Sequence, residues 1–143
     1  MAVIYFNAEY AIGVHDTIID VSGGLTGIKD KGQLESILEH IQNDLYYPEF
    51  EDKLTHLMFA VNKFHAFNDG NKRSSIGLAA YFLSINGYEH LIEHFIKEME
   101  NIVVWVAEGK ISKDLLHQIL SSLIYQDEYA ESLKLEIINA TRD

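Results

Sequence analysis

Apolar residues recur at three- and four-residue intervals along most of the chain, which is the spacing of one buried helix face. Three such stretches predict helices near 31–45, over 51–64 with an end close to His65, and over 76–85. The third stretch is apolar almost all round, as expected for a helix that other helices surround. The apolar positions of the first two stretches are Leu34, Ile37, Leu38, Ile41 and Leu45, then Leu54, Leu57, Met58, Val61 and Phe64.

Four further helices follow from capping residues and from the same periodicity. Asn7 is a good N-cap for a helix that runs through about Ile19, after a short extended piece over residues 3–6. Apolar positions over 95–106 predict another helix, and Ser112 opens the next one. A last, more polar helix is predicted over about 127–139.

One segment does not fit a helix. Three of the nine glycines fall at positions 23, 24 and 27, which predicts an irregular, mobile loop over 20–29 where a substrate could be gripped. With a single proline and no alternating strand pattern, the 143 residues predict an all-α fold. A chain of this length suits a single domain, residues 1–143.

The net charge narrows the possible partners. The chain has 22 Asp and Glu against 11 Lys and Arg, a formal charge of −11, which repels nucleic acid and anionic lipids. The absence of cysteine excludes disulfides, thiolate metal sites and a Cys nucleophile. No apolar run reaches the roughly 18 residues that span a bilayer. We therefore expect a cytoplasmic protein that binds neither nucleic acid nor membrane.

The chemistry is concentrated in nine residues, His-Ala-Phe-Asn-Asp-Gly-Asn-Lys-Arg, between two predicted helices. Lys72 and Arg73 form the only adjacent basic pair and fall in the first turn of a helix. A turn at Gly70, the free N–H groups of the helix and these two cations together predict a phosphate cradle. Asp69 is a suitable Mg²⁺ ligand, and His65 can accept a proton near neutral pH. These parts match phosphoryl transfer.

The same segment resembles the signature of the Fic/Doc family, His-x-Phe-x-(Asp/Glu)-x-Asn-(Gly/Lys)-Arg. The lysine at position 72 is that of the death-on-curing (Doc) branch, and Gly-Gly-Leu-Thr-Gly-Ile-Lys-Asp over 23–30 resembles the glycine-rich segment of these toxins. The matching motif positions are His65, Phe67, Asp69, Asn71 and Arg73.

The resemblance implies a compact helical bundle with the active-site loop between two core helices. It implies that His65 is the general base, that Asp69 holds Mg²⁺ and that Phe67 anchors the loop in the core. By the same transfer, nucleotide phosphates contact the remaining motif residues, which are Gly70, Asn71, Lys72 and Arg73.

For activity, the resemblance to the Doc branch implies a toxin-like protein kinase. Such an enzyme moves the γ-phosphate of a nucleoside triphosphate such as ATP to a Ser or Thr hydroxyl. The implied target resembles elongation factor Tu, and the implied partner is a small antitoxin. Fic-type AMP transferases usually carry Gly where this chain has Lys72, and a second Arg where it has Ile76. Nucleotidyl transfer is therefore the alternative reaction.

Three other hypotheses come from the remaining sequence. His90, Glu93 and His94 spell the inverted zinc-protease string His-x-x-Glu-His. A non-catalytic binding module is a second possibility, which the intact motif disfavours. In the third, Glu136 on the last helix competes for Arg73, because 132–137 partly resembles the inhibitory helix of some Fic proteins.

Overall fold

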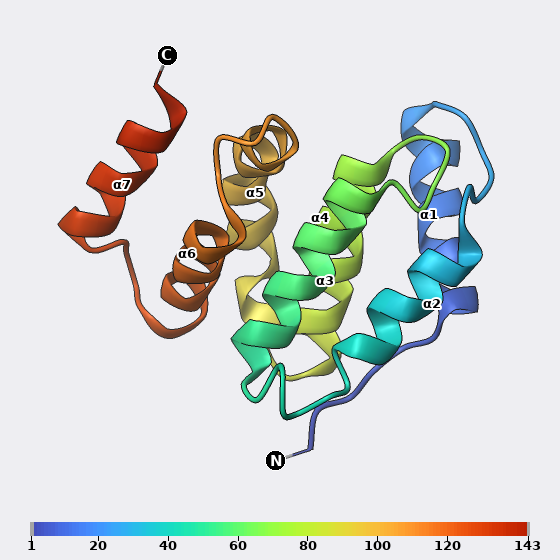
Figure 1. The fold of residues 1–143 in the computed structure, drawn as a ribbon, viewed down its shortest axis with the longest axis horizontal. Coiled ribbons are helices and arrows are strands. Elements are labelled where there is room, and N and C mark those ends of the chain that lie inside the picture. Colours follow the sequence, from blue (N-terminus) through green and yellow to red (C-terminus); the bar gives the residue numbers. More distant parts are fainter. Residues whose placement is uncertain (1, 143) are drawn as a thin grey trace.

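The structure, a computed structural model, describes residues 2–142, and all regular elements in that range are helices (Figure 1). The predicted all-α class is confirmed. No helix of the described residues combines the length and apolarity needed to cross a membrane. The elements are α1 (Ala8–Ser22), α2 (Lys31–His40), α3 (Phe50–Phe64), α4 (Asn71–Ile85), a short 3₁₀ helix η1 (Glu89–Leu91), α5 (Ile92–Ala107), α6 (Lys113–Tyr125) and α7 (Glu131–Thr141).

The structure contains the capping hydrogen bonds that were predicted for two helix N-termini. The Asn7 side chain accepts from the backbone N–H of Tyr10 at 2.9 Å, and the Ser112 hydroxyl accepts from that of Leu115 at 3.1 Å. Each bond satisfies one of the donors that a helix N-terminus leaves without an internal partner. α1 continues three residues past the predicted end at Ile19.

Two predicted boundaries are wrong. The helix near 31–45 ends at His40, because the Asn43 side chain accepts from the N–H of Leu45 at 3.0 Å and so forms a turn that competes with the helix. Leu45 is consequently 92% exposed, although it continues the apolar period. The last helix begins at Glu131 rather than near 127, since the chain must first reverse before α7 can pack on α6.

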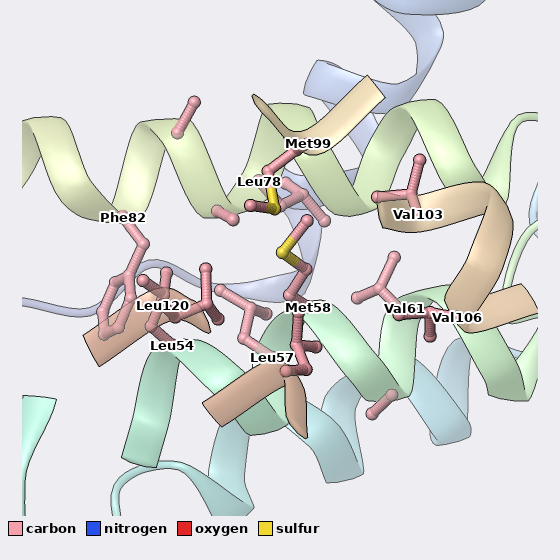
Figure 2. Close-up of a cluster of buried hydrophobic side chains, with 14 of the residues drawn as sticks. Leu54, Leu57, Met58, Val61, Leu78, Phe82, Met99, Val103, Val106 and Leu120 are labelled. Atoms are coloured by element: carbon pink, nitrogen blue, oxygen red, sulfur yellow. The ribbon is translucent and has the colours of Figure 1, made fainter. Parts of the chain in front are cut away.

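The core lies around α3 and α4, which pack against each other at the centre of the molecule (Figure 1). α1 and α2 cover one side of this pair, and α5 and α6 cover the other. Figure 2 shows side chains of these central helices meeting those of α5 and α6. The labelled residues are buried: Leu54, Leu57, Met58, Val61, Leu78, Phe82, Met99, Val103, Val106 and Leu120.

The α3–α4 pair positions the motif. α4 starts at Asn71, five residues before the apolar run that predicted it, so the motif spans a six-residue loop and the first turn of α4. The loop therefore joins two buried helices, whose packing fixes both of its ends. Ile28 and Phe67 form an isolated antiparallel bridge that holds the loop against the glycine-rich segment.

Candidate active site

His65 closes α3 in a left-handed backbone conformation, with φ 52° and ψ 52°. Among residues 2–142 it is the one non-glycine residue with positive φ. This conformation costs an L-residue roughly 1–2 kcal/mol, and residues held in it cluster at functional sites. The side chain is exposed, so it is open to a substrate.

Asn71 shapes the loop from inside. Its side-chain oxygen accepts from the backbone N–H of Phe67 at 3.1 Å, and its nitrogen donates to the carbonyl of the same residue at 3.0 Å. These two partners fix the orientation of the amide, whose nitrogen also lies 3.5 Å from Nδ1 of His65. The buried side chain is thus occupied by the loop, and Asn71 has its backbone N–H at the start of α4 to offer to a phosphate.

Phe67 anchors the loop in the core, as predicted. Its side chain is 1% exposed, and its ring stacks on that of His15 with centroids 4.0 Å apart and planes 3° from parallel. The loop between α3 and α4 therefore turns over a buried aromatic ring.

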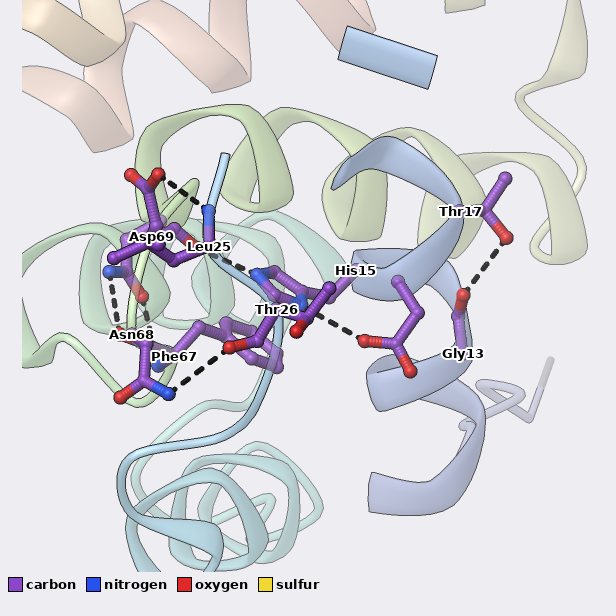
Figure 3. A network of polar contacts seen from close by, with 10 residues as sticks. Gly13, His15, Thr17, Leu25, Thr26, Phe67, Asn68 and Asp69 are labelled. Atoms are coloured by element: carbon purple, nitrogen blue, oxygen red, sulfur yellow. Dashed lines mark hydrogen bonds and ion pairs between the residues drawn. The ribbon is translucent and has the colours of Figure 1, made fainter. Parts of the chain in front are cut away.

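Asp69 holds its carboxylate between two backbone donors. Oδ2 accepts from the N–H of Leu25 at 3.1 Å (Figure 3), and Oδ1 accepts from the N–H of Gly70 at 2.8 Å. These two bonds hold the pKa of Asp69 below its ordinary value, and the bond from Leu25 contributes most. Electrostatic interactions with Arg73 and His15 lower this pKa by smaller amounts. An ionised, fixed oxygen ligand at the rim of a cleft fits Mg²⁺.

The two predicted phosphate cations differ in their surroundings. The Lys72 side chain is exposed, and within the part of the chain that the structure describes its ammonium makes no ion pair or hydrogen bond. The Arg73 guanidinium donates to the hydroxyl of Ser22 and, at 2.9 Å, to the carbonyl of Gly23. Gly70, the N-cap of α4, offers no side-chain cap, so the first-turn N–H groups stay available to an anion.

The glycine-rich loop approaches the motif closely. A Cβ on Gly24 would lie 2.7 Å from Oδ2 of Asp69 and 3.2 Å from the Arg73 guanidinium, whereas a Cβ on Gly23 would meet nothing within 4 Å. The loop is irregular, as predicted, and hydrogen bonds and a backbone bridge with motif residues join it to the site. Gly24 is needed because a side chain there would displace the loop from Asp69.

All six predicted site residues line one cleft of about 250 Å³. Three residues that were not predicted complete the lining, namely Asn62, Asn68 and Ala107. Asn62 could have been suspected, since it precedes His65 by three residues and such positions share a helix face. Its side-chain nitrogen donates to the carbonyl of Val103 at 2.9 Å and so joins α3 to α5.

A larger cleft of about 550 Å³ lies between residues 5–10 and α2. Its lining includes Glu9, Glu35 and Glu39 and no cation. The carboxylates repel phosphate groups, so an anionic ligand favours the smaller cleft beside the motif.

The structure gives no support to the two hypotheses on the C-terminal half. His90 lies in η1 while Glu93 and His94 lie in α5, all three are exposed, and no three potential metal-ligating side chains of residues 2–142 are grouped to hold an ion. Glu136 accepts from the Gln118 side chain at 3.3 Å on α6, whereas Arg73 is bonded to the end of α1. The zinc-protease string thus has no site, and Glu136 makes no contact with Arg73.

Comparisons with known proteins agree with the motif. Residues 5–83 match the Fic/DOC family. The chain is 35% identical over 112 residues to a protein named "Protein kinase doc" from Escherichia phage P1, covering 76% of this chain and 86% of that protein. It is 32% identical over 89 residues to "Toxin Doc" from Mycolicibacterium smegmatis, covering 59% and 68%. The chain therefore belongs to the Fic/DOC family.

Proposed function

We propose that this protein is a toxin that transfers the γ-phosphate of a nucleoside triphosphate, ATP by preference, to a Ser or Thr hydroxyl of a target protein. The convergence of His65, the ionised Asp69 and the Lys72–Arg73 pair in one cleft carries the proposal. The names of the two relatives support it, since one is a kinase and the other a toxin. On this proposal, residues 1–143 act as one domain.

Phosphate binding in the proposed reaction rests on the first turn of α4. The backbone N–H of Asn71 and the side chains of Lys72 and Arg73 face the triphosphate, where transition-state charge develops, and Gly70 lines the same cleft while its N–H donates to the Asp69 carboxylate. To do so, Arg73 exchanges its bonds with Ser22 and Gly23 for phosphate oxygens. Asp69 would hold Mg²⁺, which when bound supplies positive charge to the triphosphate.

His65 handles the proton. As the target hydroxyl oxygen forms a bond to the γ-phosphorus, the bond from that phosphorus to the bridging oxygen breaks and the nucleoside diphosphate leaves. The hydroxyl proton passes to an imidazole nitrogen of His65. Asn71 keeps the His65 ring in position through its contact with Nδ1 and through its two bonds to the loop backbone.

The proposal extends to partners. A translation factor resembling elongation factor Tu is the proposed target, and a small antitoxin protein is the proposed inhibitor. Both would place the activity in the cytoplasm. Neither a membrane nor nucleic acid is a proposed partner, because the net charge of −11 repels both.

The test uses bacterial lysate, the purified protein and ATP labelled at either the α- or the γ-phosphate, with and without Mg²⁺. We expect a protein band labelled from γ only, dependent on Mg²⁺ and absent with the His65→Ala variant. Label from the α-phosphate would instead establish nucleotidyl transfer. Absence of both labels, with protein shown to be free of any bound inhibitor, would reject catalysis and favour a binding module.

A further inference from the structure

His15, on α1, makes a contact that the sequence did not reveal. Its side chain is fully buried, and Nε2 lies 2.7 Å from the backbone carbonyl oxygen of Asp69 (Figure 3). A carbonyl oxygen only accepts hydrogen bonds, so Nε2 must carry the proton. A residue 54 positions earlier in the chain thus donates to the peptide at the centre of the motif.

The imidazole has little freedom to turn away. One face stacks on the Phe67 ring at 4.0 Å, and Nδ1 lies 3.4 Å from the carboxylate of Asp16. A buried ring held in this way is a fixed donor rather than a mobile side chain. The donor and the loop share the same aromatic anchor, so their relative position is set by core packing.

The direction of the Asp69 carbonyl decides where the next N–H points. The peptide unit is planar and trans, so its C=O and N–H point in opposite directions. With the carbonyl held toward His15, the Gly70 N–H points to the carboxylate of Asp69, to which it donates at 2.8 Å. Gly70 has φ 73° and no side chain, and glycine tolerates both signs of φ, so this peptide could turn over at low cost if nothing held it.

We propose that His15 is a positioning residue that locks the Asp69–Gly70 peptide, so that an N–H rather than a carbonyl oxygen faces the Asp69 carboxylate and the phosphate-binding cleft. In the turned-over peptide, the carbonyl oxygen would face the carboxylate and the incoming phosphates, and repel both. The lock itself is a property of the free protein, while its effect on Mg²⁺-nucleotide binding rests on the proposed function.

Two variants separate the hydrogen bond from the packing. His15→Gln keeps an N–H donor of similar reach but loses the stacked ring, whereas His15→Phe keeps a ring against Phe67 but loses the donor. We measure hydrogen exchange and the NMR resonance of the Gly70 amide in the free protein, and the affinity for Mg²⁺-ADP by calorimetry. Thermal unfolding shows that each variant is folded, and His15→Leu replaces the Phe variant if the larger ring prevents folding.

We expect the Gly70 amide to exchange faster and shift in His15→Phe but to stay as in the wild type in His15→Gln. Mg²⁺-ADP affinity should fall about 10- to 100-fold in His15→Phe, the loss typical of a hydrogen bond to a charged group, and less than about threefold in His15→Gln. An unchanged Gly70 amide in folded His15→Phe overturns the lock. If the Gly70 amide changes in His15→Phe but the wild-type protein does not bind Mg²⁺-ADP, the lock is supported and the proposed function is rejected.

Discussion

A lysine and a histidine lie on α3, and a second lysine and histidine lie just beyond its His65 end; the first pair is buried and the second is exposed. At the Phe50 end, Lys53 is 1% exposed, and its ammonium donates to the Ile41 carbonyl at 2.8 Å and to the Asp44 carboxylate at 2.7 Å. Beyond the His65 end, Lys72 is exposed and has no such partner among the described residues. The ammonium of Lys53 joins α3 to the segment that follows α2, while that of Lys72 is available to a ligand.

His56 on α3 and His65, which follows α3, differ in the same way. His56 is buried, and its Nδ1 lies 2.8 Å from the ammonium of Lys113 and 3.1 Å from the hydroxyl of Tyr47. Burial, together with the charges of Lys113 and His40, lowers the pKa of His56 to about 4. His65 is exposed at the edge of a cleft. A dense cluster of titratable groups therefore marks a site only where the groups are open to a ligand.

The largest expected effect in this comparison is on catalysis at His65. His65→Ala should lower kcat by about 10²–10⁴-fold, because it removes the proton acceptor. The free energy of unfolding should change by no more than about 1 kcal/mol, since His and Ala pay a similar cost at positive φ and the side chain is exposed. Kinetics with γ-labelled ATP and urea unfolding measure the two quantities. Full activity of the variant would remove His65 from its proposed role.

Next comes the anchor of the motif loop. Phe67→Ala should lower the free energy of unfolding by about 3–5 kcal/mol, because it empties a fully buried site. Phe64→Ala is the matched control on the same hairpin, and with its side chain 50% exposed it should cost about 1 kcal/mol or less. Denaturant unfolding of both variants tests this. Equal losses would show that the loop does not depend on its buried ring.

The two lysines provide the third contrast. Lys53→Met should lower the free energy of unfolding by about 1–3 kcal/mol, because it leaves the Ile41 carbonyl without its partner, and should leave nucleotide affinity unchanged. Lys72→Met should do the reverse, with unchanged stability and about tenfold weaker binding of Mg²⁺-ADP. Unfolding and calorimetry on both variants decide. If both lysines affected only stability, the distinction between bound and available charge would fail.

The smallest expected effect is the pH dependence of stability that comes from His56. The pKa of His56 is lowered in the folded state, so below about pH 6.5 the unfolded chain binds more protons, and stability falls as pH drops from about 6.5 toward 4. The full pKa difference would correspond to about 3 kcal/mol, and solvent screening reduces the expected loss of stability to about 1–2 kcal/mol. His56→Asn, whose amide oxygen can accept from Lys113 without titrating, should flatten this part of the profile. An identical slope in both proteins would assign the loss to other groups.

The sequence predicted the features that depend on residues close together in the chain, which are most helices and the motif. It missed the features that depend on packing between distant segments. Helix periodicity and the caps at Asn7 and Ser112 depend on neighbouring residues, and the motif residues are consecutive, so these features could be read directly. The end of α2 depends on a single turn at Asn43, which competes with an unbroken apolar pattern.

Residues from distant elements could not be found in this way. His15 and Leu25 contact Asp69 only because α1 and the glycine-rich loop fold over the motif. Ala107 reaches the cleft at the end of α5 and carries no chemical signal of its own. The motif therefore marked where chemistry could occur, while the supporting residues required the fold.

The most direct test of the central claim maps where a nucleotide binds. In an NMR titration of the inhibitor-free protein with Mg²⁺ and a non-hydrolysable ATP analogue, the amides of residues 70–73 should shift first and saturate together. The Arg73→Ala variant should weaken these shifts, and the amides at the Phe50 end of α3 should stay unchanged. Shifts confined to the acidic cleft at residues 5–10, or none at all, would contradict the account.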